Sequence, residues 1–340
     1  MTATPTVTVA MAVYNAAPFL RQAIDSIINQ SFTDWELIII NDGSTDHSSE
    51  IIAGYEDKRI FVIQNTQNQG LCACRLQTIA IARGKYLCFQ DADDRCSPHR
   101  LEILIKRFEA EDTLDVCGTA AWIIHEADNK KIHKKPAENV KLKTAILFGF
   151  PFISPSLCFR TEKIRQAANL MPSNIKQAED YVLLALLWRQ GGQMANLAEP
   201  LYYYRVHSGA DRITREENNA DIVAGRFAAQ RILFSVWNLS PTDEILVLHD
   251  QLTYYPQRIK QLSVAVAAAY CQWWVQVCQA NVKINHVSQT HLVQAVSNAV
   301  YRLLLQKALP FRAAARLWWQ YGKLLRPSFR AKWLIKRCIS

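Results

Sequence analysis

The first 110 residues alternate four times between a short apolar run and a segment with helical periodicity. Each apolar run has the length of a buried strand, and each following segment is long enough for a crossover helix. A chain that repeats this unit is expected to form a layered α/β fold with a mostly parallel sheet. The four pairs are Thr6–Val13 with Phe19–Ile28, Glu36–Ile40 with Ser48–Tyr55, Ile60–Ile63 with Leu71–Ala82, and Lys85–Phe89 with His99–Ala110.

Beyond about residue 215 the strand signals fade, and long helical patterns follow. The 340 residues, half of them apolar and a fifth charged, suit a folded protein with one large domain or two ordinary ones. We therefore predict an α/β domain over residues 1–210 and an all-helical region over residues 211–340. Four prolines are expected to separate the helices: Pro241, Pro256, Pro310 and Pro327.

Charge is divided unevenly along the chain. All 30 acidic residues lie at or before Asp250, together with 26 Lys and Arg, whereas the last 90 residues hold 13 Lys and Arg and no acid. This division predicts a body that is close to neutral and a basic end that meets an anionic partner.

Nine cysteines, an odd number, show neither CxxC pairs nor Cys/His clusters. Such spacing argues against a zinc site and against a disulfide framework, and it is typical of buried thiols in a reducing compartment. No run has the length and purity of a membrane-spanning helix, and the N-terminus lacks the layout of a signal peptide. We therefore expect a cytoplasmic protein.

Acidic residues follow two of the expected strands. In an open parallel sheet, ligands bind outside the carboxyl ends of the strands. Asp42 follows the second apolar run, and its carboxylate could accept hydrogen bonds from a base or ribose, or could belong to an ordinary turn. Asp91, Asp93 and Asp94 follow the fourth run, and three carboxylates this close repel one another unless a cation, donors or water offset them. Carboxylates of this kind commonly hold Mg²⁺ or Mn²⁺, although a solvated acidic loop is the alternative.

Two later segments are candidates only in context. Glu179 and Asp180 precede an apolar helix, where acids in the first turn are also expected from the helix dipole. An aromatic strand from Leu201 leads into Arg205 and His207, and a single histidine there could be structural or a ligand.

Together, six segments in this order resemble the catalytic domain of glycosyltransferase family 2. The resemblance covers about three fifths of the chain, residues 5–208, and excludes the helical region. It implies the GT-A fold, a single nucleotide-binding α/β domain with a mostly parallel mixed sheet. The segments are Val9–Asn15, Ile39–Asp46, Asn68–Gly70 followed by Arg75, Phe89–Asp94, Glu179–Asp180 and Tyr204–His207.

The resemblance implies a role for each matching residue. Ala12, Tyr14 and Asp42 would line a uracil and ribose pocket, with Arg75 nearby, and Asp91 would contact the ribose. These are the nucleotide-sugar-binding residues that we expect.

The same resemblance implies the catalytic and metal-binding groups. Asp93 would ligate Mn²⁺ or Mg²⁺ at the donor diphosphate, and His207 stands where some relatives place a metal or diphosphate ligand. Asp180 would be the general base, with Glu179 beside it helping to orient the acceptor. A cation stabilises the departing diphosphate, and in-line attack by the deprotonated hydroxyl inverts the anomeric centre.

The resemblance therefore implies an inverting, metal-dependent transfer of a sugar from a nucleotide donor, most simply a UDP-sugar. The acceptor would be a hydroxyl of a saccharide or of a lipid-linked saccharide in surface polysaccharide or cell-envelope biosynthesis. Two departures are visible: Gln90 replaces the usual aliphatic residue, and residues 168–174 replace the glycine-rich acceptor loop.

Residues 311–337 combine aromatic and basic side chains without an acid. This composition predicts peripheral contact with the anionic inner face of the cytoplasmic membrane, although a solvated helical face that packs its aromatics is the alternative. No recognised nucleic-acid-binding motif occurs, so we expect no nucleic-acid partner.

The sequence argues against three functions other than sugar transfer. A catalytically inactive, GT-A-like membrane-docking or assembly protein is opposed by the presence of all four acids at 42, 91, 93 and 180. A nucleotidyltransferase would need a glycine-rich basic signature after the first strand, where Tyr14 and Asn15 stand instead. A dehydrogenase would need GxGxxG at that place.

Overall fold

A computed structural model of the chain describes residues 4–125, 130–133, 135, 138–206, 219–306 and 308–321. The chain forms two compact units, each built from two separate segments of the sequence. The first unit contains residues 1–139 and 151–226, and the second contains residues 140–150 and 227–340.

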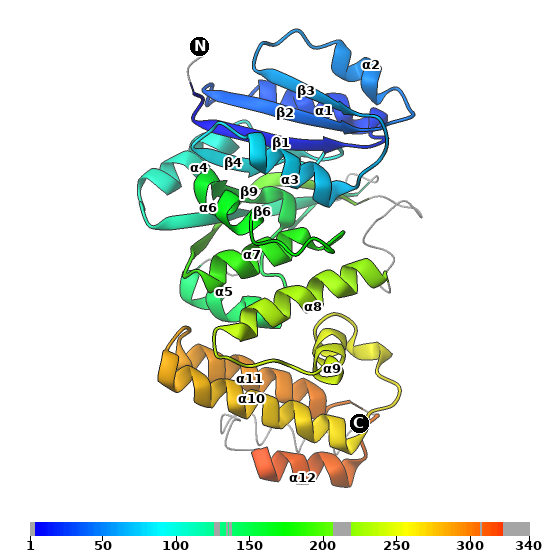
Figure 1. Cartoon of the computed structure of the whole chain (residues 1–340), viewed down its shortest axis with the longest axis vertical. Coiled ribbons are helices and arrows are strands. Elements are labelled where there is room, and N and C mark those ends of the chain that lie inside the picture. Colours follow the sequence, from blue (N-terminus) through cyan, green and yellow to red (C-terminus); the bar gives the residue numbers. More distant parts are fainter. Residues whose placement is uncertain are drawn as a thin grey trace. The chain divides into compact units, whose positions relative to one another are not determined.

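The first unit is built on a nine-stranded mixed sheet. Its strands follow the order β3-β2-β1-β4-β8-β6-β9-β5, with β7 paired to β6. The first four of these lie side by side and parallel (Figure 1), so the α/β fold predicted from the sequence is confirmed. They are β1 (Val7–Val13), β2 (Trp35–Asp42), β3 (Ile60–Asn65) and β4 (Tyr86–Phe89).

Helices connect these parallel strands, as the alternating pattern predicts. In α1 the buried side chains Leu20, Ala23, Ile24 and Ile27 recur at helical spacing and share one core with β1 and β4. Six of the seven residues of β1 are buried, and Ala12 is partly buried, which explains the nearly continuous apolar sequence of this strand. The connecting helices are α1 (Ala17–Ile28), α2 (Ser48–Ala53), α3 (Leu71–Ile81) and α4 (Arg100–Glu109).

The other half of the sheet is less regular. The short strand β8 runs antiparallel to both β4 and β6, whereas β6 and β9 are long parallel neighbours with register shifts near Thr119 and Ala120. The remaining elements of the unit are β5 (Arg95–Cys96), β6 (Leu114–His125), β7 (Lys130–His133), η2 (Ser154–Ser156), β8 (Cys158–Arg160), α6 (Thr161–Ala168), α7 (Glu179–Arg189) and β9 (Gln193–Val206).

The second unit contains helices and no strand among its described residues, as predicted for the end of the chain. Its helices begin at clear sequence signals: the hydroxyls of Thr242 and Ser263 accept hydrogen bonds from the first turns of α9 and α10. The helices are α8 (Ala220–Ser235, which starts in the first unit), α9 (Asp243–Tyr254), η4 (Pro256–Arg258), α10 (Val264–Ile284), α11 (Gln289–Leu304) and α12 (Phe311–Tyr321). Pro327 lies outside the described residues.

A short segment from the middle of the chain also belongs to the second unit. It contains most of α5 (Asn139–Ala145) and η1 (Ile146–Phe148). Phe148 stacks on Trp274 with ring centroids 4.5 Å apart, and the buried His249 lies 2.9 Å from the Leu147 carbonyl oxygen. These contacts join residues more than 100 positions apart, which local periodicity does not indicate.

Two expectations about the whole chain concern membranes and thiols. Among the helices that the structure describes, none combines the length and the apolar character that a membrane crossing requires. The eight cysteines in the described part are buried and free, as the sequence predicted, and Cys338 lies outside it.

Candidate active site

The loops after β1 and β2 are tied together at the carboxyl edge of the sheet. The Thr45 backbone N–H donates to Asn15 Oδ1 at 2.8 Å, and the Asn15 N–H donates to Ser44 Oγ at 3.1 Å. Asn15 has a left-handed φ of 50°, which asparagine adopts more readily than most residues. Next to this junction the Tyr14 side chain is 51% exposed, whereas Ala12 in β1 is partly buried. The Tyr14 ring is therefore available to a ligand.

Asp42, at the end of β2, is buried and hydrogen-bonded within the chain. Its carboxylate accepts hydrogen bonds from Asn65 Nδ2 at 2.7 Å and from the backbone N–H groups of Gln69 at 3.0 Å and Gly70 at 2.8 Å. Burial raises the pKa of this carboxyl, but the hydrogen bonds outweigh burial and the pKa is lowered. Asp42 therefore stays charged and holds the start of α3 against the end of β2.

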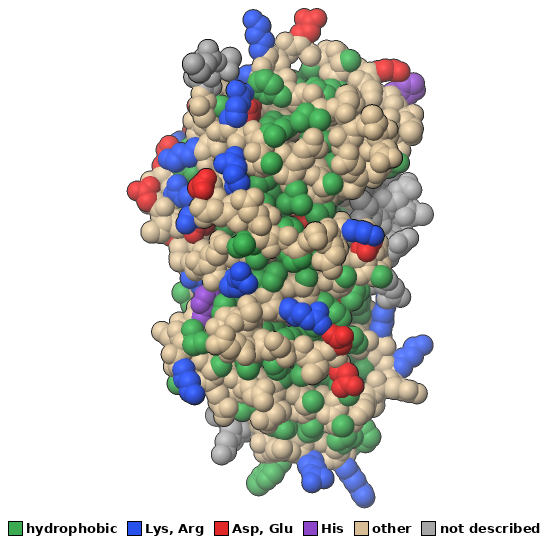
Figure 2. All heavy atoms as spheres, viewed as in Figure 1, with side chains coloured by type: hydrophobic (Ala, Val, Ile, Leu, Met, Phe, Trp, Pro, Cys, Tyr) green, Lys and Arg blue, Asp and Glu red, His purple; other side chains and the backbone are tan. Residues whose placement is uncertain are grey.

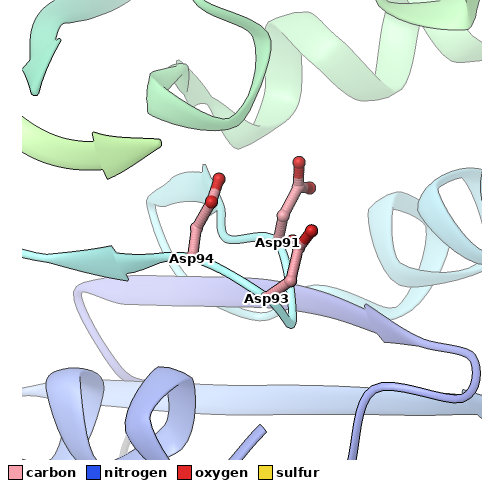
Figure 3. A group of neighbouring side chains, drawn as sticks. All are labelled: Asp91, Asp93 and Asp94. Atoms are coloured by element: carbon pink, nitrogen blue, oxygen red, sulfur yellow. The ribbon is translucent and has the colours of Figure 1, made fainter. Parts of the chain in front are cut away.

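Three carboxylates gather in the turn after β4. One oxygen from each of Asp91, Asp93 and Asp94 lies within 4.8 Å of the others. Figure 3 shows the three side chains pointing to the same side of the turn. The structure thus brings together the acids that the sequence singled out as possible metal ligands.

This acid cluster needs a positive charge to offset it. Asp94 is 2% exposed, and its Oδ2 atom is buried without a hydrogen-bond partner among the described residues. Burial, together with Asp93 and Asp91, raises the pKa of Asp94 well above its ordinary value. Burial also raises the pKa of Asp91, despite the nearby Arg75. Oxygen donors that repel one another and include a buried oxygen without a partner fit a hard divalent cation.

Strand β9 fixes the backbone of this turn. The Asp91 N–H donates to the buried Tyr202 hydroxyl at 3.0 Å, and the Arg205 N–H donates to Asp94 Oδ1 at 2.7 Å. The Arg205 side chain also donates from Nε to the Asp93 carbonyl oxygen at 2.9 Å. Sequence reasoning missed Tyr202, although the aromatic run in this strand was visible. His207, which follows β9, lies outside the described residues, and so does the chain up to 218.

Gln90 and Arg100 form a buried polar pair beside the turn. Arg100 is fully buried and donates to Gln90 Oε1 at 3.2 Å, to the Phe89 carbonyl at 2.8 Å and to the Pro155 carbonyl at 3.1 Å. Gln90 in turn donates to the Asp91 carbonyl at 3.0 Å. Gln90 therefore supplies a hydrogen-bond acceptor to a buried arginine. Its departure from the usual aliphatic residue was the sequence feature that could have indicated this pair.

Helix α7 presents the other two acids. It begins after Ala178, which has a left-handed φ of 57°. Glu179 is 3% exposed, whereas Asp180 is only partly buried and accepts a hydrogen bond from the Tyr181 N–H at 2.7 Å. Of the two carboxylates, Asp180 is thus the one that solvent or a substrate can reach.

Arg75 of α3 joins the acid turn to α7. Its Nη1 donates to Glu179 Oε1 at 2.7 Å and to Ser154 Oγ at 3.3 Å, and its Nη2 donates to Asp91 Oδ1 at 3.1 Å. The guanidinium carbon lies 4.5 Å from the centre of the Phe89 ring. Burial lowers the pKa of Arg75, but the two carboxylates outweigh burial and raise it. Burial raises the pKa of Glu179 in spite of this cation.

The structure therefore connects the predicted site residues in two groups. Arg75 and Glu179, both buried, form one ionic cluster with the partly exposed Asp91. The cluster continues from Asp91 into Asp93 and Asp94, and Asp180 directly follows Glu179 in the sequence. Ala12, Tyr14 and Asp42 lie at the ends of β1 and β2, which pair in parallel with each other.

The fold has a match among solved structures. The solved structure of S. aureus TarS 1–349 in complex with UDP-GlcNAc matches 94% of this chain and 90% of its own, with a TM-score of 0.60 and 17% identity. TarS and this chain thus share the GT-A type of fold with a helical region after it, as predicted.

Sequence comparison identifies the family. The profile described as Glycosyl transferase family 2 matches residues 8–168. EpsE of Bacillus subtilis (strain 168) is 31% identical over 214 residues, which are 62% of this chain and 76% of EpsE. The chain belongs to glycosyltransferase family 2.

Other relatives carry the same domain. EpsJ, an uncharacterized glycosyltransferase of Bacillus subtilis (strain 168), is 31% identical over 59% of this chain. The succinoglycan biosynthesis protein ExoO of Rhizobium meliloti (strain 1021) is 26% identical over 65% of this chain. The chain spans only 61% of the length of EpsJ and 66% of that of ExoO.

Proposed function

We propose that the protein is an inverting, metal-dependent glycosyltransferase that moves a sugar from a nucleotide-sugar to a hydroxyl group. The observation that carries this proposal is the Arg75 bridge. One buried guanidinium donates both to Asp91, in the acid turn, and to Glu179, beside Asp180. A single displacement at an anomeric carbon needs a donor-side carboxylate cluster and a general base in fixed positions, and Arg75 ties the cluster to the residue that precedes the proposed base.

Asp91, Asp93 and Asp94 are the residues that would hold Mn²⁺ or Mg²⁺, with His207 as a further candidate. The cluster supplies oxygen ligands, and among the described residues the buried Asp94 Oδ2 atom has no hydrogen-bond partner, which supports this assignment. When bound, such a cation would stabilise negative charge on the leaving nucleoside diphosphate.

The donor pocket is proposed to lie at the ends of β1 and β2. The half-exposed Tyr14 ring would pack against the base beside Ala12, and Asp42, with Arg75 and Asp91 further along, would complete the nucleotide site. Because TarS was crystallised with UDP-GlcNAc, a UDP-sugar is the first donor to test.

Asp180 would accept the proton of the acceptor hydroxyl as that hydroxyl attacks. Its partial exposure supports this role, whereas the buried Glu179 would act through Arg75. One base and one displacement give inversion, because no covalent intermediate on a second carboxylate forms.

The acceptor is proposed to be a saccharide or lipid-linked saccharide of a surface polysaccharide. ExoO, named for succinoglycan biosynthesis, supports this setting. We assign catalysis to residues 1–210 and a membrane-facing role to residues 211–340, at the cytoplasmic face of the membrane.

Helix α12 supports this membrane-facing role. Its Phe311 and Trp319 side chains are 50% and 83% exposed, and Arg312 and Arg316 are exposed on the same helix. On the face drawn in Figure 2, basic and apolar side chains are visible at the lower end, where Figure 1 labels α12, and the sequence has no acid after Asp250. Residues 322–337 of the predicted segment lie outside the described part.

Membrane contact is tested by flotation with vesicles. The full chain should float with vesicles that contain phosphatidylglycerol and stay behind with pure phosphatidylcholine. The variant Phe311→Ala/Trp319→Ala should float less, with Val282→Ala as a control that removes an exposed apolar side chain from α10. Equal flotation of all three proteins would contradict the role of α12.

A thermal-shift panel tests the donor assignment. The protein is heated with UDP-, GDP-, dTDP- and CMP-sugars in the presence of Mn²⁺. A ligand that binds only the folded state raises the unfolding temperature, so one nucleotide class should stand out. No shift with any class would favour the rival function, a GT-A-like docking protein without activity.

A further inference from the structure

Helix α8 contains Gly225 in its interior, where a glycine lowers the stability of a helix. Around Gly225 the helix consists of good or tolerable helix formers, and a mid-helix glycine costs about 1 kcal/mol relative to alanine. Gly225 is buried, and a Cβ atom there would lie 2.1 Å from the Gln177 carbonyl oxygen and 3.0 Å from Ala178 Cβ. Only glycine allows α8 to approach this backbone so closely.

The backbone that Gly225 approaches is the turn before helix α7. Ala178 adopts φ 57° and ψ 29°, a left-handed conformation that is strained for a residue with a Cβ atom. Its carbonyl oxygen accepts the N–H groups of Tyr181 and Val182, which start the helix. The conformation of this one residue therefore sets the direction in which Glu179 and Asp180 leave the turn.

Helix α3 holds the same turn from another side. Arg75 binds Glu179 at 2.7 Å, and the Cys72 thiol donates to the Ile175 carbonyl oxygen at 3.3 Å. Ile175 and Glu179 are thus bound to α3, and Gln177 and Ala178, which lie between them, abut α8 at Gly225. Because Cys72 and Arg75 hold the turn on the α3 side, a shift of α8 against Ala178 should be transmitted to Asp180, two residues further along the backbone.

We infer that Gly225 is a positioning residue, whose missing side chain lets α8 hold the Ala178 turn so that Asp180 faces the acceptor. The inference rests on the proposed function, in which Asp180 is the base. General-base catalysis depends steeply on position, and a displacement of about 1 Å can cost about 100-fold in rate. Of the proposed donor-site residues, only Arg75 contacts this turn, through Glu179, so we expect kcat to fall much more than donor affinity.

The test compares Gly225→Ala with Ala224→Ser, a substitution at the neighbouring exposed position of α8. The assay follows release of nucleotide from UDP-GlcNAc, or from the sugar that the thermal-shift panel selects, with Mn²⁺ and with water as acceptor. We expect kcat of Gly225→Ala to fall at least about tenfold, with donor KM and Kd within about twofold of wild type. Ala224→Ser should behave as wild type.

A second pair of variants alters the turn itself and leaves α8 intact. Ala178→Gly keeps the left-handed conformation accessible and should retain activity, whereas the β-branched Ala178→Val disfavours it and should lower kcat as Gly225→Ala does. This pair decides the question if Gly225→Ala does not fold.

Three outcomes overturn the inference. Unchanged kcat in Gly225→Ala does so while the proposed function stands, provided that wild type turns over and Asp180→Asn does not. Equal losses of kcat and donor affinity do so as well, because they indicate general disruption. A wild-type protein that binds and turns over no nucleotide-sugar overturns the proposed function and this inference together.

Discussion

Arg75 Nη1 lies 2.7 Å from Glu179 Oε1, and both side chains are almost completely buried. The pair joins residues that are 104 positions apart in the sequence. Neither charge can be removed without leaving the other in a medium that solvates it poorly.

Breaking this pair should therefore destabilise the protein strongly. Arg75→Met should lower the free energy of unfolding by about 3–5 kcal/mol, and Arg75→Met/Glu179→Leu by less than the sum of the single changes. Urea denaturation of wild type, Arg75→Met, Glu179→Leu and the double variant completes this double-mutant cycle. Lys106→Met, which breaks a surface pair with Glu102, should change the free energy of unfolding far less than Arg75→Met does. Additive losses would show that the two buried groups act separately.

Asp180→Asn keeps the shape of the side chain and removes its basicity. We expect turnover to fall at least about 100-fold, the lower end of what a general base contributes, with donor binding unchanged. Parallel measurements of kcat and of donor affinity by calorimetry separate the two effects. Near-normal turnover would remove Asp180 as the base.

Asp93→Asn removes one charge from the acid cluster. Loss of one cation ligand should weaken Mn²⁺-dependent donor binding by about tenfold or more. A tenfold loss of affinity corresponds to about 1.4 kcal/mol. Binding in EDTA should be the same for wild type and variant. Equal donor affinity of the two proteins in Mn²⁺ would place the cation elsewhere.

Tyr202→Phe deletes the hydroxyl that accepts the Asp91 N–H at 3.0 Å. A buried N–H without an acceptor costs about 1–3 kcal/mol, so the unfolding temperature should fall and Mn²⁺-dependent donor binding should weaken. Tyr203→Phe, on the neighbouring residue that stacks with Arg95, is the matched control. If both variants bind Mn²⁺ and donor as wild type does, the hydroxyl does not organise the turn.

His249 makes the stability of the second unit depend on pH. Its ring is buried between the Leu147 carbonyl oxygen and the Tyr270 hydroxyl, each 2.9 Å away, and burial lowers its pKa to about 4. Below about pH 6.5 His249 takes up a proton in the unfolded chain but stays neutral in the folded chain. The free energy of unfolding therefore decreases as pH falls from 6.5 toward 4.

The expected loss is on the order of 3 kcal/mol over that interval. Unfolding temperatures measured from pH 7 to 4 test it. His249→Gln should be less stable at pH 7 and should show a flatter dependence on pH. A slope that is identical in the variant would assign the acid sensitivity to other groups.

The first half of the fold could be predicted from local patterns. Each strand–helix unit up to α4 begins and ends within a few residues of its predicted bounds, because burial on both faces and amphipathic spacing are written in consecutive residues. The insertion of β8 between β4 and β6, and the 14-residue strand β9 beside β6, depend on pairings between distant segments. Local periodicity does not predict which distant segments pair.

The candidate site shows the same limit. Motif order indicated the acids at 91, 93, 179 and 180, whereas the groups that hold them were not predicted. Arg100, Tyr202 and Gly225 matter because of what touches them in space, and each of them looks like an ordinary core or helix residue in the sequence.

Calorimetric titration with UDP-GlcNAc, or with the donor that the thermal-shift panel selects, tests the central claim most directly. The experiment is done first in Mn²⁺ and then in EDTA. We predict saturable binding to one site in Mn²⁺ that is lost or greatly weakened in EDTA. Binding that is equally strong in EDTA, or no binding of any nucleotide-sugar, would contradict a metal-dependent transferase.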